Sequence, residues 1–362
     1  STLSMISQWL SVNIHTLSEA ELLAVIVCMD KMEFLDDKLI QTTERFMKVA
    51  AMKVKEADLI GKVIDFCLLL FIIKIFIIAA ICDLCDHQRL RSKPILEASC
   101  EYLLENALQL NLPQINSISK VFGNLNLHPS NAFKFWEKVE ILTESKHHEF
   151  PPKDLISLLL SFVYIEKFPV NMMGNLINPN FYDRMDYFAK QNVKFVMSEL
   201  DILVAAMKIE KSYIQKSSFT SCFNYDQRVF HLSRDLLDPL ASIVGDVKRI
   251  GIQEFVPGAA NNSFYSADMM VFPSVAASLY KFGRSTYAQN SRCMVVLINT
   301  PDHFDRSGQH LLGRQAMRIR HFKKMGFKVM NIRYTKASQL KMMPNQVKNY
   351  LQKEYDNALL SD

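Results

Sequence analysis

Glycine and cysteine are both sparse in this chain. Its 362 residues include 10 Gly against 49% apolar residues, a balance that excludes a disordered or collagen-like chain and favours a helix-rich globular fold. The 7 Cys are irregularly spaced, so they predict no disulfide framework and favour a reducing compartment. Cys82 and Cys85 have His87 nearby, but no second pair follows to complete a zinc site. We therefore expect no metal and no cofactor.

The first residues lack the features of a secretory signal. The stretch STLSMISQWLSVNI has neither a basic block nor a long apolar block, and it carries no initiator Met. We therefore expect the sequence to begin inside a longer protein. An Arg-rich organelle-targeting segment, if the protein has one, would then precede it.

Acidic residues are almost absent from the last fifth of the chain. From Arg292 to Lys353 there are 13 Lys and Arg but only two acidic residues, Asp302 and Asp305, which leaves a net charge of +11. Because the whole chain carries +5, the remainder sums to −6. Such an asymmetry indicates a polyanionic partner, and nucleic acid is the first candidate.

One segment is far more apolar than the rest of the chain. Residues Phe66 to Cys82 are Leu, Ile and Phe at most positions, with Lys74 as the only charge. The segment is shorter than the roughly 20 residues that a membrane span needs, and Asp65 and Asp83 bracket it. We expect a buried helix. Membrane contact and a segment foreign to the native fold remain as alternatives.

A chain of this length exceeds a single core, and a weak internal repeat indicates how it is organised. At an offset of 40 residues, two apolar helix patterns coincide, each followed by a proline-marked turn at Pro129 or Pro169. The equivalent residues are Ile115, Ile118, Phe122 and Leu125 with Leu155, Leu158, Phe162 and Ile165, then Asn131, Phe133 and Trp136 with Asn171, Met173 and Leu176. We predict a mainly α fold, an α-solenoid of stacked helical hairpins. An irregular helical bundle is the alternative.

The basic stretch has the pattern of a small α/β domain. An apolar run from Cys293 to Ile298, a helical pattern from Ser307 to Met325 and a second apolar run from Phe327 to Tyr334 predict a βαβ unit with parallel, buried strands. Pro344 suits the first turn of a final helix, which would pack on the sheet through Val347, Tyr350, Leu351 and Tyr355. Between this domain and the repeats, residues 191–285 are interpreted as two helices and a connector rich in Gly, Pro, Asn and Ser around Val256 to Ser266.

The first helix of this domain carries a row of cations. Arg314, Arg318 and His321 share one face, with Lys324 at its margin, and no acidic residue lies four positions away to pair with them. The row is spaced to meet phosphates, although a solvated helix face is the alternative. The predicted RNA-binding residues are Arg314, Arg318, Arg320, His321, Lys324, Lys328 and Arg333.

Two carboxylates and a histidine follow the first strand of the domain. Asp302, His303 and Asp305 stand where α/β folds place their chemistry, and they could bind a divalent metal and activate water. Asp302 can equally cap a turn, and Asp305 can cap the next helix. We treat catalysis here as the minor alternative.

The motifs resemble those of the Fas-activated serine/threonine kinase (FAST kinase) domain family, whose C-terminal part is called the RAP domain. The resemblance rests on Pro301 to Phe304, Leu311 to Gly313, Met317 to His321, Lys324 to Phe327 and Val329 to Ile332. It implies repeats over residues 1–110, a first FAST region over 111–190, a second FAST region or connector over 191–285, and a RAP domain over 290–355. It also implies a mitochondrial matrix protein that acts on single-stranded mitochondrial transcripts, with RNA-granule proteins as further partners.

The RAP fold is similar to the PD-(D/E)XK nucleases, so departures from the family pattern matter. Asn299 stands where family members often have Asp, and Lys336 stands where many have an acidic residue. Asp268 matches a family Asp but makes a poor metal site alone. No glycine-rich phosphate loop, VAIK lysine or DFG supports kinase activity.

Together these features predict a noncatalytic RNA-binding protein. One alternative is a metal-dependent endonuclease that uses Asp302, Asp305 and Asp268. The other is an adaptor whose basic face binds an acidic protein or a cardiolipin-rich membrane, assisted by residues 66–82.

Overall fold

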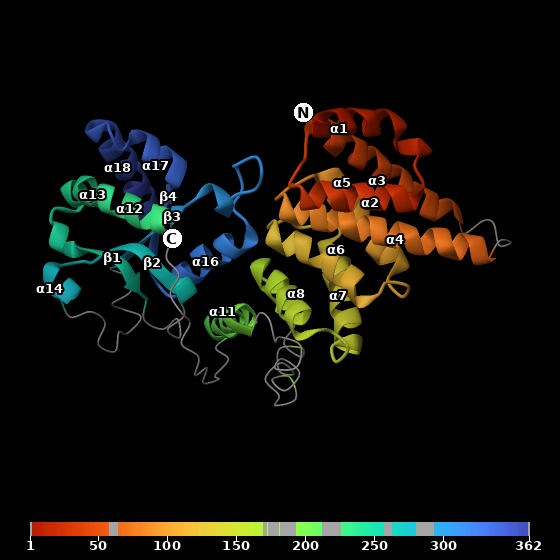
Figure 1. Cartoon of the computed structure of the whole chain (residues 1–362). Helices are drawn as coiled ribbons and strands as arrows, with labels where there is room; N and C mark the ends of the chain where they lie inside the picture. The colour runs from red at the N-terminus through yellow and green to blue at the C-terminus, as the bar shows by residue number, and fades with distance from the viewer. Residues whose placement is uncertain are drawn as a thin grey trace. The chain divides into compact units, whose positions relative to one another are not determined.

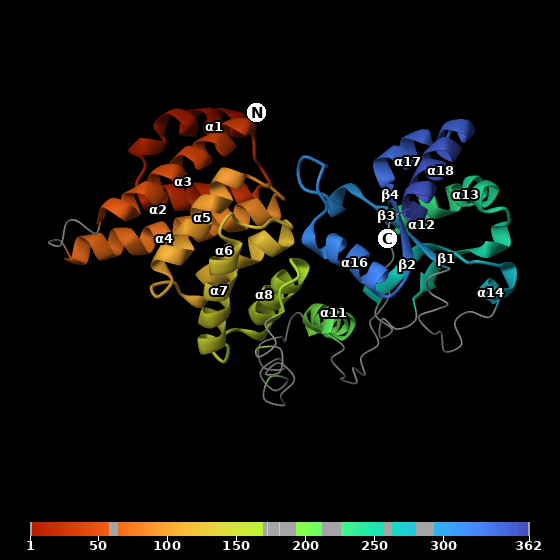
Figure 2. The ribbon, with the colours of Figure 1, turned by 180° about the vertical axis from the view of Figure 1, so that it is seen from behind.

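The computed structural model describes residues 2–57, 64–168, 172, 181, 193–211, 226–256, 263–279 and 293–360. The chain divides into two compact units, which Figures 1 and 2 show from opposite sides. Unit 1 comprises Ser1–Val193 with Asp305–Gly313, and unit 2 comprises Lys194–Phe304 with Arg314–Asp362.

Unit 1 is a two-row array of helices. Its elements are α1 (Thr2–Asn13), the 3-10 turn η1 (Ile14–Thr16), α2 (Glu19–Lys31), α3 (Asp37–Ala57), α4 (Ile64–His87), α5 (Lys93–Asn106), α6 (Leu112–Asn124), α7 (Ala132–Lys146) and α8 (Pro152–Tyr164). The odd-numbered helices pack on one another in chain order, and the even-numbered helices form a second row in the same way (Figure 1). This is the packing of stacked helical hairpins. It confirms the predicted solenoid and excludes the irregular bundle.

Local sequence sets where several of these helices begin. At α2, the Ser18 hydroxyl accepts from the Glu21 amide at 3.3 Å, and the Glu21 carboxylate accepts from the Ser18 amide at 2.8 Å. Asn111 and Gln114 form the same reciprocal pair at α6, at 3.0 and 2.9 Å. Each pair satisfies amides that the first helical turn leaves without partners.

The repeated apolar positions lie on helices that pack directly against each other. All eight residues matched between α6 and α8 are buried, and the two helices are in contact. On α7, Trp136 is buried between Phe135 and Phe162, whereas Phe133 is exposed. The second set after the turn, Asn171, Met173 and Leu176, lies outside the described residues.

The apolar segment belongs to α4. From Ile77 to Cys85 its side chains are almost all buried against α2 and α6, as expected of a core helix. Burial raises the pKa of the Cys82 thiol to about 12, and its Sγ lies 3.2 Å from the Ser99 hydroxyl. Of the residues that the structure describes, no helix combines the length and apolarity needed to cross a membrane.

Unit 2 is a four-stranded sheet with helices on both faces. Its elements are α11 (Val193–Lys211), α12 (Gln227–Asp235), α13 (Leu237–Val244), η2 (Val247–Arg249), β1 (Ile250–Phe255), η3 (Ser263–Tyr265), β2 (Ser266–Val271), α14 (Val275–Leu279), β3 (Met294–Asn299), η4 (Pro301–His303), α16 (Gly313–Lys324), β4 (Lys328–Arg333), α17 (Tyr334–Leu340) and α18 (Pro344–Leu360). The strand order is β1-β2-β3-β4, antiparallel except for the parallel pair β3 and β4. The predicted βαβ unit is therefore confirmed.

Two features of unit 2 correct the sequence-based interpretation. Strands β1 and β2 lie in the stretch interpreted as a connector, and they pair into the same sheet as β3. The polar cluster that indicated a connector lies between these two strands. The helix predicted from Ser307 begins only at Gly313, because Asp305 organises the preceding residues into a loop.

The alternation of side chains along the strands builds two cores. On one face, Val296 and Ile298 pack with residues of α12, α13, α17 and α18. On the other face, Val295 and Leu297 pack with Phe322 of α16 and residues of α11. All six residues of β3 are buried, as predicted for strands that are apolar on both sides. The carboxyl ends of β3 and β4 meet at one edge of this sheet, since Asn299 is the register partner of Arg333.

The contact between α6 and α8 leaves no space at Gly123. A Cβ atom added there would lie 2.3 Å from the Ser161 carbonyl oxygen, so the helix backbones would have to separate. We predict that Gly123→Ala destabilises unit 1 by about 1–3 kcal/mol through overpacking, whereas helix propensity alone predicts stabilisation of up to about 1 kcal/mol. Urea denaturation followed by the fluorescence of Trp136 checks the sign, because its ring packs on Phe162 of α8. Leu108→Ala at an exposed position is the control.

Candidate nucleic-acid interface

Helix α16 carries most of the predicted RNA-binding residues. Its inner face is anchored by Met317 and Phe322, both fully buried in unit 2. Its cations point in several directions and do not form one exposed row. Their partners in the structure show which of them remain available to a ligand.

The acidic residues missing from α16 itself are supplied by α11. Arg314 Nη1 contacts Glu199 Oε1 at 2.6 Å, and Arg320 Nε contacts Glu210 Oε1 at 2.8 Å. Lys324 also pairs with Glu210, whose side chain is only 1% exposed. These cations therefore pair within unit 2, although no acidic residue lies four positions away in the sequence.

His321 is enclosed in the same cluster. Its ring is fully buried, with Nδ1 2.6 Å from the Tyr265 hydroxyl and Nε2 3.1 Å from Glu210 Oε1. A neutral imidazole satisfies both contacts when Nδ1 accepts from Tyr265 and Nε2–H donates to Glu210. His321 therefore joins α11 to α16 and does not present its ring to a ligand at the surface.

Arg318 also points into unit 2. Its side chain is 10% exposed, Nη2 donates to the Ser266 carbonyl at 2.6 Å, and the same nitrogen lies 3.5 Å from Asp268 Oδ1. Asp268 Oδ2 accepts from the Ile298 amide at 2.7 Å. Burial raises the pKa of Asp268, and the Arg318 guanidinium opposes that shift. The pair links β2, β3 and α16, so Asp268 has a structural partner where a nuclease would need a metal.

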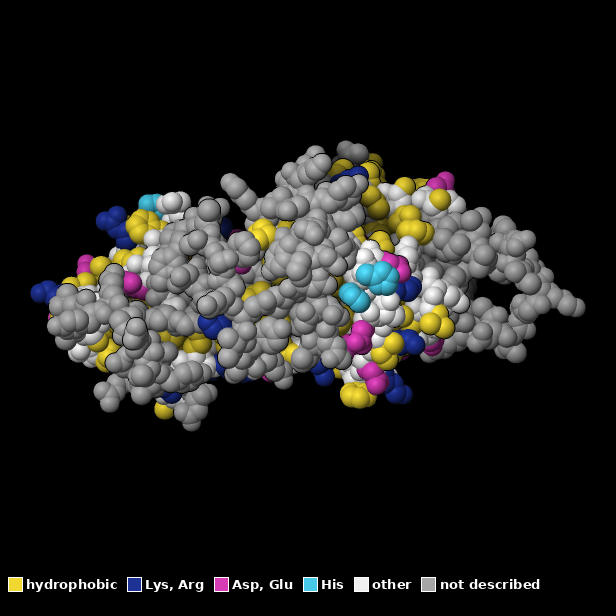
Figure 3. Space-filling model, turned by 90° about the horizontal axis from the view of Figure 1, so that it is seen from below, with side chains coloured by type: hydrophobic (Ala, Val, Ile, Leu, Met, Phe, Trp, Pro, Cys, Tyr) yellow, Lys and Arg dark blue, Asp and Glu magenta, His cyan; other side chains and the backbone are white. Residues whose placement is uncertain are grey.

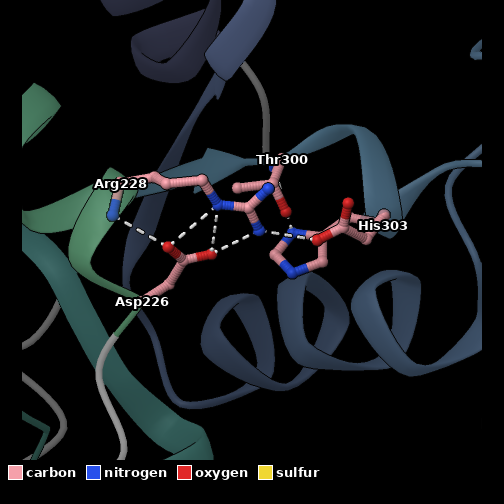
Figure 4. Close-up of polar contacts among 5 residues, drawn as sticks. Asp226, Arg228, Thr300 and His303 are labelled. Atoms are coloured by element: carbon pink, nitrogen blue, oxygen red, sulfur yellow. Dashed lines mark hydrogen bonds and ion pairs between the residues drawn. The ribbon is translucent and has the colours of Figure 1, made fainter.

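The residues after β3 form a second polar cluster with the start of α12 (Figure 4). Arg228 Nη2 lies 2.7 Å from Asp302 Oδ2 and 2.7 Å from Asp226 Oδ2, and Arg228 Nε makes two further contacts with Asp226 at 3.1 Å. The hydrogen bond from the Arg228 side chain is the main reason that the pKa of Asp226 lies below its ordinary value. Asp302 is thus held at the surface by an arginine.

His303 turns away from solvent beside this cluster. Its Nδ1 accepts from the Thr300 amide at 3.3 Å. Burial, with a smaller effect of the Arg318 charge, lowers the pKa of His303 to about 4. The imidazole is therefore neutral at physiological pH.

The Asp305 side chain accepts hydrogen bonds within the loop of unit 1 that follows it. It accepts hydrogen bonds from Ser307 and His310 side chains at 2.8 and 3.0 Å and from the Gln309 and His310 amides at 3.0 and 3.1 Å. Burial acts to raise the pKa of Asp305, but these bonds together outweigh it and the pKa is lowered. The next residue, Arg306, donates to the Arg89 and Leu35 carbonyls at 2.8 and 2.6 Å. Asp305 is therefore the centre of a loop and does not cap the following helix.

Across the described ranges, no three His, Cys, Asp or Glu side chains converge as metal ligands. Asp268, Asp302 and Asp305 each have different partners, and Asp305 belongs to unit 1. Lys328 and Arg333 lie at opposite ends of β4. The seven predicted RNA-binding residues thus do not form one surface.

Two exposed cations lie where β3 and β4 end, and we define this region as the carboxyl edge: residues 300–304, Arg333 and the first turn of α17. The Arg333 guanidinium lies 4.6 Å from the centre of the Phe304 ring, and Lys336 Nζ lies 4.7 Å from the centre of the Tyr350 ring. Lys336 and Arg228 were not predicted as site residues. The only signal for Lys336 was its departure from the family pattern, and Arg228 carried none.

The described cations on the face seen from below are more dispersed. In the view from below, Lys and Arg of the described surface stand singly among hydrophobic and acidic side chains (Figure 3). In unit 1, Lys120 is held by Asp83 at 3.1 Å and lies 4.0 Å from Asp86. Charge of one sign is therefore not continuous over these parts of the molecule.

Comparison with known proteins agrees with this architecture. Residues 115–186 match the family model described as FAST kinase-like protein, subdomain 1, and residues 296–354 match the RAP domain model. The first range begins in α6, and the second runs from β3 into α18. These matches define an RAP-domain protein with a preceding helical FAST region.

Among similar proteins is the mitochondrial FAST kinase domain-containing protein 3 of Rattus norvegicus, which is 26% identical over 76% of this chain and 42% of that protein. The protein of the same name from Homo sapiens is 27% identical over 77% of this chain and 42% of its own length. The Fas-activated serine/threonine kinase of Mus musculus is 21% identical over 74% of this chain and 56% of that protein. The chain is therefore similar to the FAST kinase domain-containing proteins, and its two matched ranges are a FAST kinase-like subdomain and a C-terminal RAP domain. The chain spans about two fifths of the length of the FAST kinase domain-containing protein 3 relatives from Rattus norvegicus and Homo sapiens.

Removing Arg318 is expected to destabilise unit 2. We predict a loss of about 3–5 kcal/mol for Arg318→Ala, because Asp268 is left as an unpaired buried charge. Arg314→Ala, on the same helix but with a more exposed pair, is expected to cost less than about 1 kcal/mol. Hydrogen exchange of β3 amides measures the loss in unit 2 directly, since both Trp residues, Trp9 and Trp136, lie in unit 1. Equal losses of stability in the two variants would contradict the assignment of Arg318 as the partner that neutralises the buried Asp268.

The stability of unit 2 is expected to fall as the pH falls from about 6.5 to about 4. His303 stays neutral in the folded state down to a pKa of about 4, while the unfolded chain binds a proton from about pH 6.5, so acid favours unfolding. The difference amounts to on the order of 2–3 kcal/mol. His303→Asn, which keeps an acceptor for Thr300, should flatten this dependence in hydrogen exchange at β3. Burial raises the pKa of Asp201 to about 6, so protonation of Asp201 stabilises unit 2 as the pH falls. This opposite contribution is the same in the unmodified protein and in His303→Asn.

Proposed function

We propose that the chain is a noncatalytic RNA-binding protein of mitochondria that controls the stability or processing of mitochondrial transcripts. The matches to the FAST kinase-like and RAP domain models support RNA binding. The relatives are named as mitochondrial proteins, which supports the same location here. In this proposal the protein binds single-stranded RNA in the mitochondrial matrix.

The observation that carries the proposal is the pair of cations at the carboxyl edge. Arg333 and Lys336 are exposed, and each is held over an aromatic ring of unit 2. A cation held in this way loses less side-chain freedom when it meets a phosphate. The register of the sheet places Arg333 beside the end of β3, so the backbone of an RNA strand can follow this edge.

The partners of the three candidate catalytic carboxylates support a noncatalytic role. Asp268 pairs with Arg318, Asp302 with Arg228, and Asp305 with its own loop. A metal-dependent nuclease needs carboxylates that converge on one ion. Here arginine occupies the neighbourhood of two of them, and the third belongs to unit 1.

Reversing charge at the carboxyl edge is expected to weaken RNA binding. We predict that Arg333→Glu with Lys336→Glu lowers the affinity for a labelled single-stranded RNA at least about tenfold near physiological salt. The slope of log K against log salt should fall by about 1.4, because each lost phosphate contact removes about 0.7. Fluorescence anisotropy over a salt series measures both quantities.

The matched control is Lys248→Glu with Lys323→Glu. These lysines are exposed, lie in η2 just before β1 and in the last turn of α16, and so belong to the opposite edge of the sheet. The control makes the same change of charge and should bind RNA nearly as the unmodified protein does. Equal losses in both variants would place the interface elsewhere. RNA cleavage that requires Mg²⁺ or Mn²⁺ and disappears in Asp302→Ala would replace the proposal with the nuclease alternative.

A further inference from the structure

The carboxyl edge carries an exposed carboxylate beside its cations, and nonspecific phosphate binding gives no reason for it. Asp302 is 61% exposed and stands three residues beyond Asn299, the register partner of Arg333. A carboxylate at this place repels the RNA backbone. The Arg228 guanidinium offsets part of this repulsion, and the exposed carboxylate can accept hydrogen bonds from a part of RNA that donates them.

Arg228 fixes the position of this carboxylate. Asp226 holds Arg228 through two nitrogens, at 2.7 and 3.1 Å, and also accepts from the Arg228 amide at 2.8 Å. Arg228 then contacts Asp302 Oδ2 at 2.7 Å. The carboxylate is thus oriented by a chain of charged hydrogen bonds that begins at Asp226, the N-cap of α12, and Figure 4 shows the contact between Asp226 and Arg228. An oriented acceptor can distinguish bases, which a mobile surface side chain does poorly.

We propose that Asp302 reads an unpaired guanine in the bound RNA. A carboxylate offers two acceptor oxygens. Guanine alone among the four bases has two adjacent donors, N1–H and the 2-amino group, on its Watson–Crick edge, which is accessible in single strands. The base contacts Asp302 while Arg333 and Lys336 bind the flanking phosphates. This inference rests on the proposed function and adds base selection to it.

The experiment compares three labelled RNA strands of equal length that differ at one position: guanosine, inosine or adenosine in an otherwise uridine strand. Anisotropy titrations of the full chain should give tighter binding to the guanosine strand than to the adenosine strand by about 5- to 100-fold, the range of a bidentate base contact. Inosine lacks the 2-amino group and should fall between them. The Asp302→Asn variant keeps an oxygen for Arg228 and should lose most of the preference, without losing affinity for the adenosine strand.

Asp238→Asn is the control, because it removes an exposed carboxylate from α13 of the same unit and should leave the preference unchanged. Equal affinity of the unmodified protein for all three strands would overturn the guanine contact and leave RNA binding intact. An equal loss for all strands in Asp302→Asn would also overturn it, since Asp302 would then support only the fold. Absence of binding to every strand would overturn both this inference and the proposed function.

Discussion

The buried charge of Glu210 is the constraint on which the arrangement of unit 2 depends. A carboxylate with 1% exposure is stable only when cations and donors surround it, and Arg320, His321 and Lys324 do so. All three come from the last turns of α16, whereas Glu210 comes from α11. The position of α11 over the sheet is therefore set by charge as well as by apolar packing. Because the RAP sequence supplies the cations, it also fixes a helix that lies outside the RAP range.

Because buried carboxylates need cations beside them, part of the basic stretch from Arg292 to Lys353 is used inside the fold and the rest stays exposed. Arg318 neutralises Asp268, and the cations of α16 that contact α11 are paired there. The net charge of the stretch thus overstates the charge that a ligand meets. Among the cations that stay exposed are Arg333 at the end of β4 and Lys336 in α17, each of which lies over an aromatic ring. Under the proposed function, electrostatic attraction of RNA depends on the exposed cations and not on the net charge of the whole stretch.

Sequence patterns predicted those elements whose residues are selected by local burial. The apolar runs of β3 and β4 and the apolar stripe on α18 indicate a strand or a helix directly. In each of them the buried positions recur at the period of the element, and an apolar side chain fills each one. Strands β1 and β2 escaped prediction since their sequences IGIQEF and SADMMV carry Gly, Gln and Asp and mix polar with apolar positions. The roles of Arg314, Arg318 and His321 also could not be predicted, because their acidic partners Glu199, Asp268 and Glu210 lie about 50 to 115 residues earlier. Local spacing holds no information on such pairs.

The four-stranded sheet also changes what counts as a folding unit. The RAP match begins at residue 296, inside β3, while β1 and β2 precede it; β2 pairs with β3 through backbone hydrogen bonds, and β1 pairs with β2. A fragment cut at the start of the match would expose β3 as an apolar edge strand, a form prone to pair with other chains. It would also lack Glu210 and Tyr265, the partners of the buried His321. The sequence family and the physical domain thus have different boundaries, and fragments that follow the former discard half of the sheet.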